Sequence, residues 1–339
     1  MARYLGVDLH RNNFTVCTIA ENGRRYFREY ALHAMPLFVK GLRKTDQVAV
    51  EVSTTTRLFH DAVAPHVDRV VVVNSSEFDV IRKSVKKTDR GDAETLATFL
   101  SKDLLPEVRM KDKLHAELAS LTQTRDMLVK QRTALKNKIN NMLAARGFSP
   151  KREMLSSEKG LRQVEELPLG PVVMAELRAL VAQIRSLGKT IAELEGTIKQ
   201  EAEKLPGHEN LKSIKGIGDN GAAILLSAIG DINDFPSEKK LASYFGIVPR
   251  VRNSNQTERT GRITKRGTKL GRTTLVQCAL VAMRYSEYLQ IFYRRIARKR
   301  GKGKAIIALA KKFLGVIYRT LKNDWIFEDF PNFVLAERA

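Results

Sequence analysis

Apolar residues in the first hundred positions alternate with polar ones or form short continuous runs, as they do in β-strands. Five such segments follow one another, at residues 3–9, 14–20, 25–32, 47–53 and 69–75. The first three are closely spaced and predict an antiparallel meander. The last two are typical of parallel strands covered on both faces, and residues 56–66 between them predict the crossover helix. Residues 1–110 are therefore expected to form an α/β domain, which ends with a helix beginning in "KTDRGDAETLATFLSK".

The periodicity changes to a helical one in the next segment. Leucine, isoleucine and methionine recur with heptad spacing over residues 114–142 and again over 177–198. Arg125 and Arg132 interrupt the first series, and "ARGFSP" ends it. Residues 111–205 are therefore expected to form two long amphipathic helices. They would be either a helical hairpin within one chain or a coiled-coil arm that dimerises.

Residues 206–339 are expected to form a further helical domain, so that the whole chain combines an α/β part with an all-α part. In "LKSIKGIGDNGAAILLSAIGDINDF", Gly216 and Gly218 lie between two apolar helical stretches. This pattern indicates a helix-hairpin-helix, whose turn amides can hold a DNA phosphate without reading sequence. The alternative is a tight glycine turn that only packs the two helices.

Positive charge is concentrated in the last third of the chain. "RTGRITKRGTKLGR" predicts a basic loop, and "RRIARKRGKGKAIIALAKK" predicts a basic entrance to a helix. Charge runs usually form solvated faces, yet runs so one-sided and interleaved with glycine more often contact phosphates. The expected nucleic-acid contacts are Lys215, Gly216, Gly218, Arg262, Lys265, Arg266, Arg298, Lys299, Arg300, Lys302 and Lys304.

The overall charge agrees with a polyanionic partner. Lysine and arginine number 59 against 37 acidic residues, a formal net charge of +22 over 339 residues. An anionic membrane surface is the competing explanation, but no run of eighteen apolar residues exists. The chain starts in a strand without a signal peptide, and its two cysteines, Cys17 and Cys278, form neither a disulfide framework nor a zinc cluster. A cytoplasmic, nucleoid-associated protein that binds nucleic acid is expected.

Four carboxylates in the α/β domain are candidates for metal binding. Asp8 ends the first strand and Glu51 lies in a buried strand, while Asp89 and Asp92 stand three residues apart on a helix. Phosphoryl transfer by two divalent ions requires several such acids to converge, and Mg²⁺ prefers oxygen ligands. Each acid also has a simpler explanation: Asp8 as a turn cap, Glu51 as a strand-end polar residue, Asp89 as an N-cap and Asp92 as a first-turn acid.

The order of these acids resembles the DEDD insertion-sequence transposases and the related Piv-type DNA invertases. "KTDRGDAETLA", "IKGIGDNGAAILLSAIGD" and "LASYFGIVPR" followed by "GRITKRG" match the family's motifs in the family's order. The resemblance covers nearly the whole chain. It implies a RuvC-like ribonuclease-H fold for the first domain, with Asp8, Glu51, Asp89 and Asp92 holding Mg²⁺ or Mn²⁺.

The resemblance also implies a serine nucleophile in the C-terminal domain. The matching position is Ser254, in a segment read as a polar loop, and composition alone would not have singled it out. Two features depart from the family pattern. Asn255 replaces a glycine that often follows the serine, which makes Thr257 the neighbour to test. The loop "EVSTTTR" replaces the family's "E.TG.Y" element after Glu51.

Taken together, the sequence predicts an insertion-sequence transposase that acts as a site-specific DNA recombinase. The resemblance implies attack by Ser254 on a DNA phosphate, guidance by a structured (bridge) RNA that the element encodes, and a dimer or tetramer. The alternatives are a RuvC-like nuclease that uses water, an architectural DNA-binding protein, and an actin-like ATPase or sugar kinase. No second glycine-rich phosphate loop supports the last of these.

Overall fold

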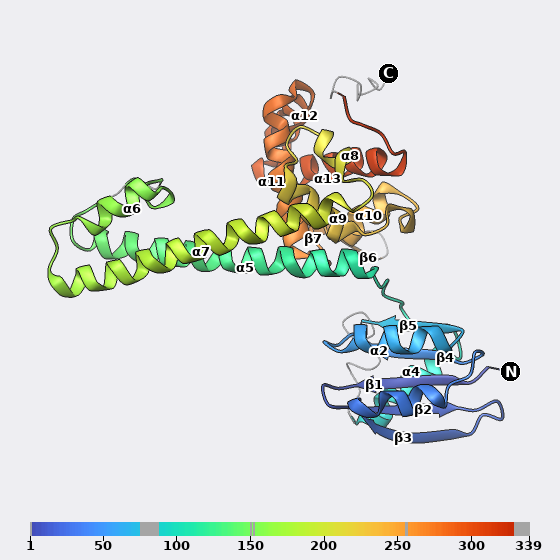
Figure 1. The fold of residues 1–339 in the computed structure, drawn as a ribbon. Coiled ribbons are helices and arrows are strands. Elements are labelled where there is room, and N and C mark those ends of the chain that lie inside the picture. The colour runs from blue at the N-terminus through green and yellow to red at the C-terminus, as the bar shows by residue number, and fades with distance from the viewer. Residues whose placement is uncertain (1, 75–87, 150, 152, 255–256, 329–339) are drawn as a thin grey trace, which may run out of the picture. The chain divides into compact units, whose positions relative to one another are not determined.

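The computed structural model describes residues 2–74, 88–149, 151, 153–254 and 257–328. The chain divides into two compact units, Met1–Met110 and Lys111–Ala339 (Figure 1). The second unit contains both the long helices and the basic C-terminal part. Their division at residue 205 stays a prediction.

The first unit is built on a mixed five-stranded sheet. Its strands are β1 (Tyr4–Leu9), β2 (Asn13–Ile19), β3 (Arg25–Ala31), β4 (Gln47–Glu51) and β5 (Arg69–Val73). Their order is β3-β2-β1-β4-β5, with β1, β2 and β3 antiparallel and β1, β4 and β5 parallel. This is the RuvC-like strand order, and it confirms the predicted meander followed by a parallel pair.

Alternation along the strands gives the sheet two apolar faces. Leu5 and Val7 of β1 face α1 (Met35–Lys40) and α2 (Thr56–Val63), where Phe14 and Phe59 pack edge to face with ring centroids 5.6 Å apart. The opposite face carries Ala49 and is covered by α4 (Asp89–Leu100). The sequence patterns missed α1, which is a helix of only six residues.

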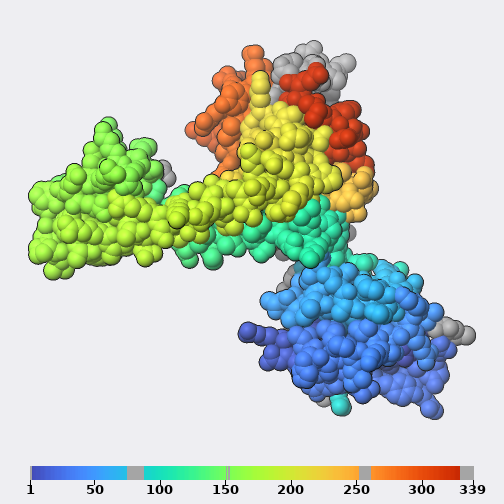
Figure 2. All heavy atoms as spheres, viewed as in Figure 1, coloured from blue at the N-terminus to red at the C-terminus, as the bar shows by residue number. Residues whose placement is uncertain are grey.

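The heptad helices of the second unit pair with each other. α5 (Lys113–Ala144) and α7 (Pro171–Glu203) form a hairpin, green to yellow-green in Figures 1 and 2, with the short α6 (Glu158–Glu165) at its tip. The buried heptad residues of the two helices form the seam within one chain. The heptads therefore need no second chain to be buried.

The two arginines of α5 that interrupt the first heptad series each lie opposite a residue of α7 that accommodates the guanidinium. The Arg125 Nε donates to Glu195 Oε1 across the hairpin at 2.8 Å. Arg132 lies opposite Gly188, where the absence of a side chain leaves room for the guanidinium. An arginine at an apolar position is tolerated when its charge is paired or its stem is packed.

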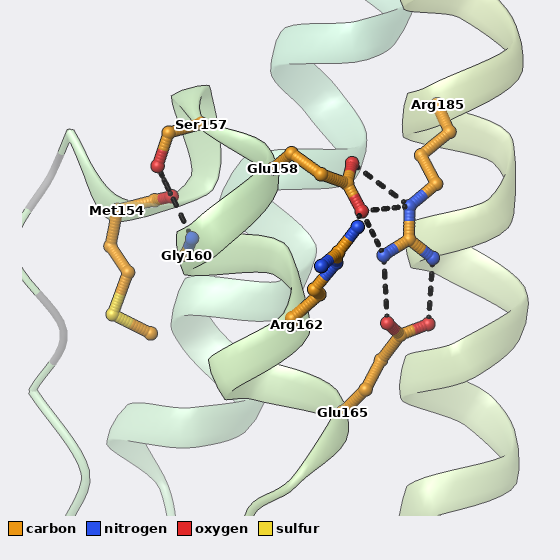
Figure 3. Close-up of polar contacts among 7 residues, drawn as sticks. All are labelled: Met154, Ser157, Glu158, Gly160, Arg162, Glu165 and Arg185. Atoms are coloured by element: carbon orange, nitrogen blue, oxygen red, sulfur yellow. Dashed lines mark hydrogen bonds and ion pairs between the residues drawn. The ribbon is translucent and has the colours of Figure 1, made fainter.

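An ion-pair network fastens α6 to α7 at the tip (Figure 3). The Arg185 guanidinium of α7 donates to both carboxylates that face it, to Glu158 Oε1 at 2.7 Å and to Glu165 at 2.8 and 2.9 Å. Arg185 lowers the pKa of the Glu158 carboxyl below its ordinary value. Such forked contacts restrain direction as well as distance, so they orient the tip helix.

The remaining helices pack around one apolar core with the base of the hairpin. They are α8 (His208–Ser213), α9 (Asp219–Ile229), α10 (Glu238–Tyr244), α11 (Lys269–Ala282), α12 (Glu287–Arg300) and α13 (Lys302–Lys322). Elsewhere and here, the described part of the chain also forms short 3₁₀ turns, at Leu32–Ala34, Ala64–His66, Met154–Ser156, Ile232–Asp234 and Met283–Tyr285. Phe245 and Phe313 are fully buried at the centre. Among the described residues, no helix has the length and apolarity required to cross a membrane.

Two strands interrupt this helical region where the sequence predicted loops. β6 (Pro249–Ser254) and β7 (Thr257–Ile263) pair antiparallel, with Ser254 opposite Thr257. The predicted basic loop, residues 259–272, is therefore strand β7 as far as Ile263 and helix α11 from Lys269, and Ser254 ends a strand. The sequences of these two strands show no apolar alternation, so the periodicity that reveals core strands was absent here.

Candidate active site in the N-terminal unit

Two of the predicted acids come from neighbouring parallel strands. Val7 of β1 pairs with Val50 of β4, so Asp8 and Glu51 follow side by side at the same edge of the sheet. Successive side chains of a strand point to opposite faces of the sheet. Because Val7 and Val50 lie in the core on the other face, Asp8 and Glu51 both lie on the face that α4 covers. Asp8 is buried and Glu51 is partly exposed.

The other two acids come from the first turn of α4. Thr88 caps this helix by accepting a hydrogen bond from the Gly91 N–H at 3.1 Å, so Asp89 is not the N-cap. Asp92 is buried, whereas Asp89 is largely exposed. A first-turn acid is favoured by the helix dipole, but that benefit does not require burial.

Gly6 brings α4 onto β1. A Cβ atom at Gly6 would lie 2.0 Å from the Ala93 carbonyl oxygen and 2.4 Å from the Ala97 nitrogen, both in the backbone of α4. Only glycine allows this approach. Because Gly6 precedes Asp8 by two residues on the same face, the contact brings the first turn of α4 to the Asp8 carboxylate.

The pKa of Asp8 is sensitive to the charges of the other three acids, which indicates that the four lie near one another. Burial raises the pKa of the Asp8 carboxyl, the neighbouring His10 lowers it, and the charges of Asp89, Asp92 and Glu51 raise it further. The like charges thus make ionised Asp8 unfavourable without a compensating cation. The alternative in which Asp8 only caps the hairpin turn leaves this convergence of acids unexplained.

Sequence reasoning missed one member of the cluster, His10. Its Nε2 lies 3.2 Å from Asp8 Oδ2 and 3.5 Å from Asp89 Oδ1, so these three side chains have the spacing of a metal site. The only sequence signal was its position, one residue beyond the strand that carries Asp8. The carboxylates form an oxygen donor set that fits Mg²⁺ or Mn²⁺, whereas the imidazole nitrogen of His10 is not a ligand that Mg²⁺ prefers.

The unusual loop after Glu51 is held by its own hydroxyl groups. The Thr56 hydroxyl donates to the Glu51 carbonyl oxygen at 2.9 Å and accepts from the Ser53 N–H at 2.6 Å. The Thr55 hydroxyl donates to the His10 carbonyl oxygen at 3.4 Å. The "STTT" sequence therefore links the end of β4 to the β1–β2 turn, both of which carry site residues.

Ser254 belongs to the second unit, at the end of β6. The base of its hairpin is fastened to the helical core. Arg272 of α11 donates to the carbonyl oxygens of Phe245 and Arg266 at 3.1 and 3.0 Å, and the Lys265 N–H donates to the Gly246 carbonyl oxygen at 3.0 Å. These bonds hold the backbone on both sides of the hairpin.

All nine cations predicted to contact nucleic acid are exposed. Arg298, Lys299 and Arg300 end α12, where the helix dipole by itself favours positive charge. Lys302 and Lys304 begin α13, where the dipole opposes it and no acid lies in the first turn. A bound phosphate would offset this unfavourable interaction with the helix dipole. The two lysines at the start of α13 therefore favour a phosphate contact more strongly than the cations at the end of α12.

The glycine turn between α8 and α9 contains two glycines with different surroundings. Gly216 has a φ of 108°, and a Cβ there would lie 2.7 Å from the Ala282 nitrogen of α11. This glycine is therefore required for packing. Gly218 is exposed, has nothing within 4 Å of a built Cβ, and precedes the first residue of α9, so its surroundings leave space for a phosphate.

Comparison with known proteins agrees with both parts of the chain. Residues 5–146 match a DEDD transposase family of the IS110 type, and residues 208–294 match the family described as "Transposase IS116/IS110/IS902 family". The chain belongs to the IS110/IS1111 family of transposases. This transposase is thus an enzyme of DNA phosphoryl transfer, and its DEDD domain implies a divalent metal.

Individual relatives span most of the transposase. It is 26% identical over 333 residues to the transposase for insertion sequence element IS1111A of Coxiella burnetii, covering 94% of this chain and 89% of the relative. It is 27% identical over 247 residues to a probable family 20 transposase of Pseudomonas aeruginosa, covering 70% and 73%. A pilin gene-inverting protein of Moraxella bovis is 26% identical over 351 residues, covering 96% and 97%.

Proposed function

We propose that this transposase is a site-specific DNA recombinase in which Asp8, Glu51, Asp89 and Asp92 bind Mg²⁺ or Mn²⁺. The observation that carries the proposal is the convergence of the acids. The four come from three separate elements, β1, β4 and α4, which strand pairing and the close approach at Gly6 bring together, and the charges of the other three act on Asp8. A bound divalent ion would supply positive charge for the phosphate under attack. The first domain would then be a RuvC-like ribonuclease-H domain in function as well as in strand order.

Ser254 is the proposed nucleophile. A bond forms between its Oγ and the DNA phosphorus as a backbone P–O bond breaks; the serine proton passes to solvent or a base, and the released strand oxygen is protonated. A serine hydroxyl is a weak nucleophile, so it needs an activating metal or base. Support comes from the family motif around Ser254 and from the fastened hairpin that carries it.

The exposed cations are proposed to hold the backbones of DNA and of an element-encoded guide RNA. Lys302 and Lys304 at the start of α13 support a phosphate contact. The net charge of +22 suits a protein that binds two nucleic acids at once. Base pairing would then read sequence while the protein holds the backbones. Strand exchange needs several active sites, so we propose a homo-oligomer, a dimer or a tetramer.

The decisive experiment follows DNA cleavage and protein–DNA linkage together. The full-length chain is incubated with Mg²⁺, the guide RNA and DNA carrying the junction of the element's two ends. The parent is expected to cleave and to leave a covalent adduct on denaturing gels. Asp92→Ala is expected to bind DNA but lose both products, because the metal site is broken.

Two matched variants distinguish the candidate nucleophiles Ser254, Thr257 and water. Ser254→Ala is expected to abolish the adduct, and Thr257→Ala is expected to retain it. Cleavage without any adduct would favour the water-using nuclease instead. Full cleavage by Asp92→Ala would contradict the metal site, and DNA binding by the parent without any cleavage would favour the architectural DNA-binding protein.

A further inference from the structure

A recess of about 520 Å³ lies directly beside the acid cluster in the first unit. Its walls come from β2, β3 and the first turn of α4, and they include Thr15, Phe27, Glu29, Thr88, Asp89 and Arg90. Asp89 thus belongs both to the recess and to the proposed metal site. A group that occupies the recess therefore lies next to the site of phosphoryl transfer.

The lining is mostly polar and charged and includes one aromatic ring, that of Phe27. Phe27 lies on the edge strand β3 and is 37% exposed, and the Arg90 guanidinium lies 5.9 Å from the centroid of its ring. Glu29 follows on the same face of β3 and accepts a hydrogen bond from Asn13 Nδ2 at 2.7 Å. Thr15, which pairs with Asp8 in the strand register, is buried.

These features match the chemistry of a nucleobase. Bases stack on exposed aromatic rings and on arginine planes, largely without regard to sequence. A carboxylate such as Glu29 can accept a hydrogen bond from the exocyclic amine of cytosine. The arginine at the rim can also meet the backbone phosphate that every nucleotide carries. A volume near 500 Å³ falls in the range of small-molecule sites.

We propose that this recess holds one unstacked base of the DNA strand, next to the phosphate that is attacked at the acid cluster. Phe27 lies against the face of the base and Arg90 meets the adjoining backbone. The proposal rests on the proposed function of the acids, because Asp89 both lines the recess and is a proposed metal ligand. Since unstacking a paired base costs free energy, the recess favours DNA that is already opened or distorted.

The test measures base capture without requiring cleavage. Full-length protein, with Ca²⁺ in place of Mg²⁺, is bound to DNA spanning the element's junction. A single 2-aminopurine is stepped through the positions around the cleaved phosphate. At one position its fluorescence is expected to change on binding to the parent and not on binding to Phe27→Ala. Tyr26→Ala is the matched control, because Tyr26 is 54% exposed and precedes Phe27 on the opposite face of β3.

An abasic residue at the responding position completes the test. With the base present, Phe27→Ala is expected to bind the DNA about five-fold more weakly or worse, as the loss of one stacking contact predicts. With the base removed, parent and Phe27→Ala are expected to bind equally. Phe27→Tyr, which keeps a ring, is expected to behave like the parent and thereby excludes misfolding as the cause.

The outcomes distinguish this proposal from the function on which it rests. If DNA is bound and no position responds to Phe27, the base site is wrong, and cleavage by the parent in Mg²⁺ leaves the recombinase intact. If one position responds as expected but the parent never cleaves in Mg²⁺, the base site stands and the catalytic proposal fails. If 2-aminopurine placed in an added guide RNA responds to Phe27 and no DNA position does, the assignment to DNA is overturned.

Discussion

At the scale of single residues, the main feature is an acid placed where its charge is unfavourable. Asp8 is buried at the end of a strand, and Asp89, Asp92 and Glu51 raise its pKa in addition to burial. His10 offsets only part of this effect. A structural polar residue would not be expected to gather three like charges around it, whereas a metal-binding site requires that arrangement.

Asp8→Asn is therefore expected to stabilise the metal-free protein while removing its response to metal. The substitution keeps the size of the side chain and deletes one buried negative charge, so the melting temperature without divalent ions should rise by a few degrees. In the parent, Mg²⁺ at a hundredfold excess over its Kd should add about 2.7 kcal/mol to the free energy of unfolding. Thermal unfolding with and without Mg²⁺ measures both effects.

The control for this substitution is Asp61→Asn. Asp61 lies on α2, its side chain is 55% exposed, and it pairs with Arg57. It is expected to leave the response to Mg²⁺ unchanged. Equal responses of Asp8→Asn and the parent to Mg²⁺ would contradict the assignment of Asp8 as a ligand.

At the scale of secondary structure, the site depends on how closely one helix approaches one strand. Gly6 allows the backbone of α4 to lie against β1, and Thr88 fixes where that helix begins. Together they set the position of Asp89 and Asp92 over the sheet. The first turn of α4 also forms one wall of the recess beside the site.

Gly6→Ala is expected to weaken metal binding without touching a proposed ligand. Its added Cβ would lie 2.0 Å from the Ala93 carbonyl oxygen, so α4 has to move away from β1. Overpacking of this kind typically costs about 1–3 kcal/mol of stability. The displacement should also raise the Kd for Mg²⁺, which calorimetric titration of the folded variant measures.

Gly41→Ala provides the comparison for Gly6. Gly41 follows α1, has an ordinary φ of −87°, and a Cβ there would lie 3.4 Å from the Phe38 carbonyl oxygen. It is expected to bind Mg²⁺ as the parent does. Parent-like metal affinity in Gly6→Ala would mean that the position of α4 does not control the site.

At the scale of the whole molecule, the structure shows the first of the two arrangements that the heptad pattern allowed, a hairpin within one chain. α5 and α7 bury their seam against each other, so the heptads themselves supply no argument for a second chain. In the proposed function, the oligomer follows from strand exchange and not from the arm. Ser254 and the four acids belong to different compact units, so the proposed reaction requires the two to come together.

Mixing two inactive variants tests whether active sites are shared between chains. Ser254→Ala retains the acids and Asp92→Ala retains the serine, so a mixed oligomer that shares sites contains some complete ones. Recombination of the element's junction DNA is then expected to return to a fraction of the parent rate. The mixture should stay inactive if each chain completes its own site, and size-exclusion chromatography confirms that mixed oligomers have formed.

The sequence by itself determined the elements whose patterns are dictated by burial. The alternation in the first hundred residues predicted all five strands of the sheet, and the heptads predicted both long helices, because apolar periodicity records which face is buried. Asp8 and Glu51 were also visible, since a charge at the end of an apolar strand is costly unless it is paired or binds a metal. Asp89 and Asp92 were visible as a pair three residues apart on a helix. Ser254 was found only through resemblance to a family.

The tertiary structure decided everything that depends on the approach of distant segments. His10 became part of the site because the turn after β1 folds back over Asp8 and meets α4. Phe27 and Arg90 are 63 positions apart in the sequence, and only the packing of α4 across the sheet makes them two walls of one recess. The sequence of the β6–β7 ribbon carries no apolar period, so its strands are recognised only by their pairing. Sequence patterns record burial, whereas these features rest on close approach and backbone pairing between segments that are not adjacent.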